Sequence, residues 1–320
     1  MQLLITGGLG FIGSNFIRHM LDQYPHCTIT NLDKITYAGN PANLSDYDKD
    51  PRYFFIKGDI CDSQCVELLF SQHPFDAVIH FAAESHVDRS IHDASSFVTT
   101  NVLGTQILLN AALRHGTGKF IHISTDEVYG SINAGSFKET DPLNPSSPYS
   151  ASKAGSDLLA RSFFITHGLP VIITRCTNNF GPFQYPEKLI PFFVTNLLRG
   201  KKVPVYGTGM NVRDWIYVKD HCRAIDFLLR HGTPGEIYNI GGGHELSNLE
   251  ITHQILSILN KDSASIEFVK DRPGHDWRYS LDFTKLRKIG WEPRSTFNDA
   301  LKETVDWYVQ NSGWWKPLLR

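Results

Sequence analysis

Two neighbouring carboxylic acids, Asp126 and Glu127, follow the apolar run 120–123 and the hydroxyl residue Thr125. Placing carboxylates at the end of a buried strand is costly, because desolvation opposes their ionised forms. A structural role rarely requires both. A reaction that removes one proton and delivers another does require two such groups, so the pair predicts general acid and base catalysis.

A glycine-rich turn lies near the start of the chain, where Gly7, Gly8, Gly10 and Gly13 follow a short apolar run. Glycines permit the tight turn and the close approach of backbone to a pyrophosphate, which the N-terminus of the next helix attracts. Asp33 closes the next predicted strand, where its carboxylate would bind ribose hydroxyls and repel a 2′-phosphate. The motif therefore predicts NAD as the cofactor in preference to NADP.

Two further charged residues bear on this cofactor. Lys34 follows Asp33 directly and is the residue that most weakens the preference for NAD. Asp59, in the turn after the third predicted strand, fits a contact to adenine. The alternative for Asp59 is an ordinary turn aspartate.

Tyr149 and Lys153 form a second chemical pair. Ser147 and Pro148 predict a helix start, with Ser as N-cap and Pro at the first helical position, so the four-residue spacing puts Tyr149 and Lys153 on one face. Tyrosine titrates near about 10, and we expect the Lys153 ammonium and an oxidised nicotinamide ring to lower this pKa. Tyr149 would then take the proton of a substrate hydroxyl that Thr125 holds, while hydride leaves the same carbon.

The strands and helices that position these candidate site residues can be predicted from the sequence, in which short apolar runs alternate with segments of helical spacing. The runs predict strands at 3–6, 29–32, 53–56, 77–81, 120–124 and 171–175, and the segment 11–21 has helical spacing. Nearly continuous apolar strands separated by helices indicate a parallel sheet covered on both faces. We therefore expect an α/β fold with a doubly wound, Rossmann-type sheet, in which residues 1–176 form the NAD-binding domain.

The pattern changes after residue 176, where Pro and Gly become frequent. Later segments, such as 249–259 and 297–308, have the spacing of amphipathic helices. We expect residues 177–320 to form mainly a smaller mixed α/β lobe, with some later segments returning to the sheet.

The composition excludes several classes of protein. A net charge of −2 over 320 residues argues against a surface that coats nucleic acid. The five cysteines are scattered, and Cys61 and Cys65 lack a second pair, which predicts free thiols in a reducing compartment and no metal site. No run reaches the ~18 apolar residues of a membrane span, and no leader pattern precedes the first strand. We expect a soluble, cytoplasmic protein that binds neither membrane nor nucleic acid.

At these motifs the chain resembles the extended short-chain dehydrogenase/reductase superfamily and, within it, the family of dTDP-glucose 4,6-dehydratases. The matching segments cover nearly the whole chain and are NLDKITYAGN, FAAESHVDRSI, STDEVYG, SPYSASKAGSD, NNFGPFQYPEKLIP, NVRDWIYVKDH, NIGGGHELSN and DRPGHDWRYSLD. Related epimerases usually lack the acid pair, whereas decarboxylases and GDP-mannose dehydratases commonly keep only the glutamate. The full Thr-Asp-Glu therefore favours the dTDP-glucose family or a close UDP-glucose analogue.

The resemblance implies an NAD-dependent hydro-lyase that converts dTDP-D-glucose to dTDP-4-keto-6-deoxy-D-glucose and water. Oxidation at C4, with Tyr149, Lys153 and Thr125, would acidify the C5 proton. Glu127 is the candidate base for that proton, and Asp126 is the candidate acid for the departing C6 hydroxyl. The hydride would return to C6, so NAD would stay bound. The adjacency of the two acids leaves their division of roles open.

The resemblance also implies contact residues for each ligand. The cofactor would contact Gly7, Gly10, Phe11, Ile12, Gly13, Asp33, Lys34, Thr36, Asp59, Ile60, Ala82, Ala83, Thr100, Tyr149, Lys153 and Asn179. The nucleotide sugar would contact Ser85, Thr125, Asn178, Lys188, Leu189, Pro204, Tyr206, Arg213, Asn248, Arg272 and His275. Arginine suits this role because its guanidinium can fork onto diphosphate oxygens.

Helices predicted around 97–113 and 149–167 carry apolar residues beyond one core stripe. In the superfamily such helices pair into a four-helix bundle between subunits, which implies a homodimer.

Two alternatives stay open. Another enzyme on the same fold, a UDP-glucose 4,6-dehydratase or a sugar-nucleotide 4-epimerase, would use much of the same machinery. A non-catalytic NAD-binding scaffold is the alternative of another class, although such proteins tend to lose the tyrosine or the lysine. Rhamnose-bearing polysaccharides and glycosylated natural products both draw on such a deoxysugar product, so the consuming pathway is also open.

Overall fold

A computed structural model describes residues 1–271 and 276–319 of the chain. Its largest element within these residues is a parallel sheet of seven strands in the order β10, β6, β5, β4, β1, β2, β3. In chain order these are β1 (Gln2–Thr6), β2 (Thr28–Asp33), β3 (Tyr53–Lys57), β4 (Ala77–His80), β5 (Lys119–Thr125), β6 (Val171–Cys176) and β10 (Ile237–Ile240). The predicted doubly wound sheet is confirmed.

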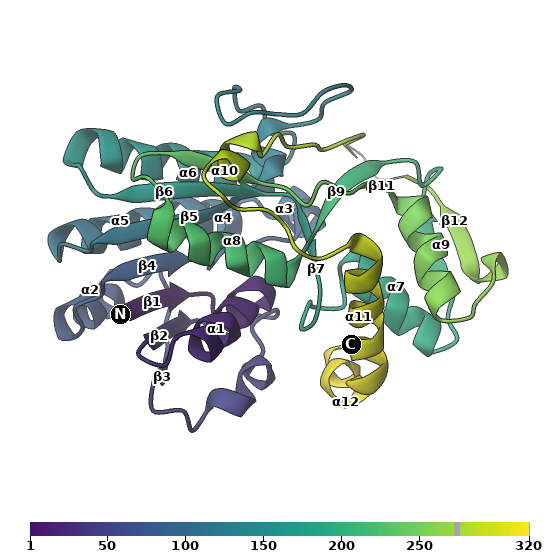
Figure 1. Cartoon of the computed structure of the whole chain (residues 1–320), viewed down its shortest axis with the longest axis horizontal. Helices are drawn as coiled ribbons and strands as arrows, with labels where there is room; N and C mark the ends of the chain where they lie inside the picture. The colour runs from purple at the N-terminus through teal and green to yellow at the C-terminus, as the bar shows by residue number, and fades with distance from the viewer. Residues whose placement is uncertain (272–275, 320) are drawn as a thin grey trace.

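Helices cover both faces of this sheet (Figure 1). In β1, Leu3 and Ile5 belong to one apolar cluster and Leu4 to another, because successive side chains of a strand point to opposite faces. The helices are α1 (Phe11–Gln23) and α8 (Val218–His231) over the first cluster, and α2 (Ser63–Gln72), α5 (Thr105–Arg114) and α6 (Pro148–His167) over the second. A strand buried on both faces needs apolar residues throughout.

Helix α6 begins as its sequence predicts. Ser147 is the N-cap, its hydroxyl accepts from the Ser150 N–H, and Pro148 takes the first helical position. The helix ends at Gly168, whose φ of 70° is a left-handed conformation that glycine adopts at little cost. Tyr149 therefore lies in the first turn and Lys153 one turn later.

The predicted helix around 97–113 is a continuous run of three pieces. These are α4 (Ser95–Phe97), the π-helical segment η3 (Val98–Gly104) and α5. The π-helical segment places Asn101 where its amide binds both main-chain groups of Glu84 and the hydroxyl of Ser152. This junction ties the helix to α6 and to the loop after β4.

A smaller lobe lies beside the main sheet, at the right of Figure 1. Within the described residues it holds a three-stranded sheet, β11-β9-β7, and a two-stranded sheet, β12-β8. Its elements are β7 (Asn178–Phe180), α7 (Leu189–Leu198), β8 (Val203–Tyr206), β9 (Val212–Tyr217), β11 (Glu245–Ser247), α9 (Asn248–Ile258), β12 (Ile266–Val269), α11 (Phe297–Gln310) and α12 (Ser312–Trp315). Two short helices pack against the main part, α3 (Val87–His92) beside α6 and α10 (Thr284–Lys288) beside β10.

The chain after residue 176 contributes to both parts. Strand β10 pairs with β6 at the edge of the main sheet, and α8 packs against α1 on its face. The elements from β7 to β9, and those from β11 onward except α10, build the smaller lobe.

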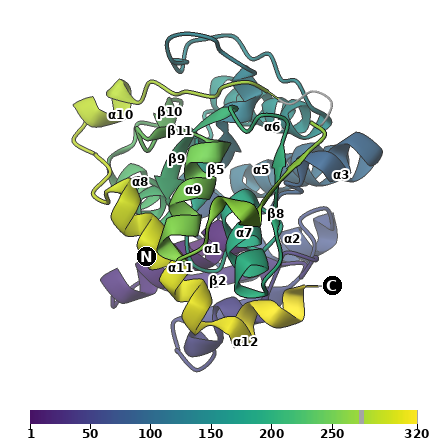
Figure 2. The ribbon, with the colours of Figure 1, turned by 90° about the vertical axis from the view of Figure 1, so that its right-hand side faces the viewer.

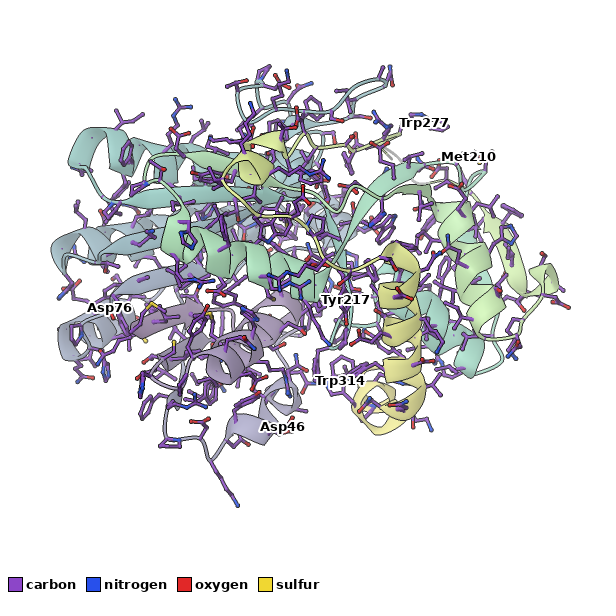
Figure 3. All side chains as sticks on the ribbon, viewed as in Figure 1. Asp46, Asp76, Met210, Tyr217, Trp277 and Trp314 are labelled. Atoms are coloured by element: carbon purple, nitrogen blue, oxygen red, sulfur yellow. The ribbon has the colours of Figure 1, made fainter. Side chains whose placement is uncertain are left out.

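The C-terminal helices α11 and α12 pack back toward the N-terminal part of the chain, which is purple in Figure 2. The Trp314 indole N–H donates to Oδ1 of Asn43 over 2.8 Å, and the Asn43 amide donates to the main-chain oxygen of Leu9 over 2.9 Å. Figure 3 shows Trp314 and Asp46, which mark the two sides of this contact. The smaller lobe thereby touches the segment that supports the glycine turn.

Two further expectations bear on the whole chain. Across residues 1–271 and 276–319, no helix combines the length and apolar character that a membrane crossing requires. The five cysteines are free, which confirms the prediction of unpaired thiols.

Candidate active site

A cavity of about 390 Å³ opens at the carboxyl ends of the main strands, between the two parts of the chain. Every residue predicted to contact the cofactor lines it, from Gly7 in the first turn to Asn179 in β7. In an open α/β sheet, ligands bind where the strand order reverses, and here β1 stands between β2 and β4. The topology explains why residues so distant in sequence meet.

The glycine turn is shaped to admit a ligand close to its backbone. Gly7 has a φ of 72°, and a Cβ on it would lie 2.6 Å from the amide nitrogen of Ala82. A Cβ on Gly13 would lie 2.4 Å from the main-chain oxygen of Gly7. Only glycine fits at these two positions, and helix α1 begins at Phe11 with its N–H groups toward the cavity. The turn therefore fits a dinucleotide pyrophosphate.

Asp33 is built into the same turn. Its Oδ2 accepts from the Leu9 N–H over 2.9 Å, and its Oδ1 accepts from the Ile35 N–H over 2.8 Å. Burial raises the pKa of this carboxyl, while the two backbone donors lower it. Each oxygen keeps a second lone pair for a ribose hydroxyl.

Lys34 and Asp59 form an ion pair, with Nζ 2.6 Å from Oδ2. Asp59 Oδ1 also accepts from the Cys61 N–H, so this residue stabilises its turn as well as lining the cavity. The positive charge of Lys34, which weakened the prediction of NAD, is thus neutralised by the Asp59 carboxylate.

The tyrosine and lysine both line the cavity. Desolvation and the Glu127 carboxylate raise the pKa of Tyr149 well above its usual value, whereas a hydrogen bond with Thr125 lowers it. Lys153 is buried, its Nζ donates to the main-chain oxygen of Ile123 over 2.7 Å, and burial lowers its pKa to about 8. The predicted lowering of the tyrosine pKa involves the oxidised nicotinamide ring as well as Lys153, so it stays a prediction for the protein with NAD bound.

The acid pair occupies two different environments. Thr125 ends β5, donates its hydroxyl to Asp126 Oδ1 over 3.1 Å and accepts from the Glu127 N–H over 3.3 Å. Asp126 is 3% exposed, and burial together with Glu127 raises its pKa well above the usual value. Its Oδ2 has no hydrogen-bond partner among the described residues. Glu127 is partly exposed and lines the cavity. A protonated acid beside a more accessible carboxylate can serve as proton donor and proton acceptor.

The predicted substrate residues fall into three groups. Those that line the cavity are Ser85, Thr125, Asn178, Lys188 and Leu189. Those outside its lining are Pro204 and Tyr206 in β8, Arg213 in β9 and Asn248 at the start of α9. Arg272 and His275 lie outside the described residues.

Arg213 is held by the chain that flanks the undescribed segment. Its guanidinium donates to the main-chain oxygens of Val212 over 2.7 Å and Asp276 over 2.8 Å, and lies 4.4 Å from the ring centroid of Tyr279. Its positive charge also lowers the pKa of Asp126, against the larger effects of burial and Glu127. Arg213 is therefore electrostatically connected to the acid pair.

Some cavity residues were not predicted from the sequence. Among them are Glu84, Cys176, Gln184, Tyr185, Glu187 and Trp215. Gln184, Tyr185 and Glu187 stand in the segment NNFGPFQYPEKLIP, which is the signal that would have identified them. Within residues 1–271 and 276–319, no group of three or more His, Cys, Asp or Glu side chains is placed to hold a metal ion.

Comparison with known proteins agrees with this geometry. The family described as GDP-mannose 4,6 dehydratase matches residues 4–304. A dTDP-glucose 4,6-dehydratase of Streptomyces niveus is 54% identical, over 99% of this chain and 96% of its own length. A dTDP-glucose 4,6-dehydratase of Escherichia coli is 45% identical, over 98% of this chain and 94% of its own length.

Solved structures extend the comparison to the fold. DesIV, a dTDP-glucose 4,6-dehydratase from Streptomyces venezuelae with NAD and TYD bound, superposes with a TM-score of 0.97 at 55% identity, covering 99% of this chain and 100% of that chain. A UDP-glucose 4-epimerase from Thermotoga maritima, with UDP-glucose, has a TM-score of 0.91 at 29% identity, covering 98% and 100%. The fold is thus shared with epimerases, whereas the higher identity is with dehydratases.

Proposed function

Because the chain belongs to the GDP-mannose 4,6 dehydratase family, we propose that it is an NAD-dependent hydro-lyase acting on dTDP-glucose, a dTDP-glucose 4,6-dehydratase. The observation that carries this proposal is the contrast between buried Asp126 and accessible Glu127, within the cavity that also holds Tyr149 and Lys153. An epimerase needs the tyrosine and lysine alone, whereas elimination of water needs the second acid–base pair.

The residues of the cofactor half fit NAD. The glycine turn would take the pyrophosphate, Asp33 the ribose hydroxyls, and Thr100 and Asn179 lie further along the same cavity. Bound NAD supplies a hydride acceptor for C4 and a hydride donor for C6.

The residues of the protein divide the proton transfers. Thr125 holds the C4 hydroxyl, and Tyr149 accepts its proton while Lys153 lies beneath. Glu127 takes the proton from C5 once C4 is a ketone. Asp126, whose pKa burial and Glu127 raise, gives its proton to the departing C6 hydroxyl.

The smaller lobe would hold the nucleotide. Lys188 at the cavity and Arg213 in β9 supply cations for the diphosphate, and Asn178 and Asn248 supply amides. Pro204 and Tyr206 of β8 would lie against the base, where Tyr206 has 43% of its surface exposed. We include Arg272 and His275 in this set on resemblance alone.

We also propose a homodimer and a cytoplasmic location. Helix α6 and the π-helical segment η3 expose Val98, Leu103, Leu158 and Ile165, at 54%, 46%, 60% and 67% of their surfaces. A second copy of these helices, forming a four-helix bundle, would cover them. Five free cysteines suit a reducing compartment.

Incubation with dTDP-glucose and UDP-glucose in parallel tests the proposal. The 4-keto-6-deoxy product, which has lost one water, should be detected by mass spectrometry with dTDP-glucose and much less with UDP-glucose. Product with UDP-glucose alone would reassign the substrate, and an epimerised sugar of unchanged mass would identify an epimerase. No turnover with either would favour a non-catalytic NAD-binding scaffold.

A further inference from the structure

The segment 181–188 joins β7 to α7 in the smaller lobe and is fastened to helix α1 of the main part. The main-chain oxygen of Pro182 accepts from the Asn15 amide over 3.0 Å, and the Phe183 ring lies 4.5 Å from the guanidinium of Arg18. Phe183 has a φ of 67°, an unusual conformation for a residue with a side chain. The segment therefore has a fixed path that local backbone preference does not explain.

Glu187, near the end of this segment, touches two loops of the cofactor domain. Its Oε1 accepts from the Tyr37 hydroxyl over 2.9 Å, and its Oε2 lies 3.5 Å from Nε2 of His86. Its side chain is only 15% exposed. The Arg89 guanidinium lies 3.6 Å from the centroid of the Tyr37 ring, and Tyr185 meets that ring edge-on at 5.5 Å. Burial and the Glu187 carboxylate raise the pKa of Tyr37, so its hydroxyl stays a donor.

Each of these contacts stands next to a residue proposed to bind a ligand. Tyr37 follows Thr36, which lines the cofactor cavity, and His86 follows Ser85, which lines it at the sugar side. Glu187 itself precedes Lys188, whose Nζ donates to the main-chain oxygen of Ser85 over 3.2 Å. One carboxylate thus holds together the loops that would contact the cofactor, the sugar and the diphosphate.

We propose that Glu187 is a positioning residue that couples retention of the cofactor to binding of the nucleotide sugar. Its contact with Tyr37 keeps the loop after β2 closed over the cofactor cavity. The same contact fixes Lys188 where it can meet the diphosphate. The substrate half of this inference rests on the proposed function, whereas the cofactor half rests on the cavity and its contacts.

Tyr37→Phe and Glu187→Ala, with the double variant, test the coupling. Tyr37→Phe removes the donor and leaves the ring beneath Arg89. Loss of a hydrogen bond to a carboxylate should speed the release of NAD about tenfold and raise KM for dTDP-glucose about as much. At saturating NAD and substrate, kcat of Tyr37→Phe should stay within about twofold, since Tyr37 does not line the cavity. The double variant should be no worse than Glu187→Ala, because the two residues act through each other.

Tyr47→Phe is the matched control. The Tyr47 hydroxyl donates to Asp22 Oδ1 over 2.7 Å, on the same domain but outside the cavity lining. Its loss should leave NAD release and KM unchanged. The inference is overturned if Tyr37→Phe leaves both quantities unchanged, lowers only the melting temperature, or adds fully to Glu187→Ala.

The two proposals fail in different ways. A wild-type enzyme that does not turn over dTDP-glucose would contradict the proposed function, and the NAD-release comparison would then decide the inference. Normal turnover together with unchanged NAD release in Tyr37→Phe would contradict the inference alone.

Discussion

Lys153 and Asp157 lie on successive turns of helix α6, and both side chains are buried, with 4% and 1% of their surfaces exposed. Asp157 Oδ2 accepts from Arg175 Nε over 2.9 Å, and Oδ1 lies 3.3 Å from His122 Nε2. Residues four apart share a helix face, so the carboxylate acts on the ammonium from beneath. Asp157 raises the pKa of Lys153 against the larger lowering by burial.

We expect Asp157→Asn to move the alkaline loss of activity to lower pH. Burial lowers the pKa of Lys153 to about 8, while Asp157 and Cys176 raise it against that effect. The ammonium is therefore present below that pH and is lost as pH rises through it. Removing the carboxylate, and leaving the Arg175 charge unpaired nearby, should lower the midpoint by about one unit or more. The profile of kcat against pH measures this.

Asp226→Asn provides the control for that profile. Asp226 is also buried and binds His19 over 2.9 Å and Arg230 over 3.1 Å, but on α8, outside the cavity lining. Both variants should lose stability, because each replaces a buried carboxylate that accepts a hydrogen bond from an arginine. Equal shifts of the alkaline midpoint in both would show that Asp157 has no particular effect on Lys153.

Glu127→Gln should separate oxidation from elimination. The variant keeps the size of the side chain but cannot accept the C5 proton. NADH should still form on mixing with dTDP-glucose, whereas exchange of the C5 proton with solvent deuterium should stop, and kcat should fall by ~10²–10⁴. Product formation at the normal rate would remove Glu127 from the proposed role.

Asp126→Asn should have the complementary effect. The amide oxygen can still accept from Thr125, so the local geometry is kept while the proton donor is lost. C5 exchange should persist and loss of the C6 hydroxyl should slow by ~10²–10⁴. If exchange stops here and persists in Glu127→Gln, the two roles are reversed.

Leu158→Asp combined with Ile165→Asp should convert the protein to a monomer. Both residues are exposed on α6, and charges there would oppose burial against a second copy. Sedimentation velocity measures the mass. Leu68→Asp on α2, at a leucine that is 57% exposed, should leave it unchanged. A dimer that survives the double change would place the interface elsewhere.

The parts of the site predicted from sequence are those fixed by local chemistry. The turn at Gly7 and Gly13 needs glycine because a Cβ would collide with backbone, and the start of α6 follows from Ser147 and Pro148. Both signals are contained in a few adjacent residues.

The parts that were missed depend on contacts between distant segments. Glu187 meets Tyr37 across 150 positions of sequence, and nothing in either segment alone indicates that contact. Burial and the Glu127 carboxylate raise the pKa of Tyr149, and neither effect is visible in the spacing of Tyr149 and Lys153. Contacts between distant segments and the effect of burial on a pKa can be determined only once the folded structure is known.

The Asp33 contacts have a consequence for redesign of cofactor choice. Exchange of Asp33 for an apolar residue would remove the acceptors of the Leu9 and Ile35 N–H groups, and so disturb the pyrophosphate turn itself. Lys34 is not available to bind a 2′-phosphate, because its ammonium already forms an ion pair with Asp59. An engineer who wants an NADP-dependent enzyme must therefore rebuild the loop and release the lysine together, since selectivity here is part of the scaffold.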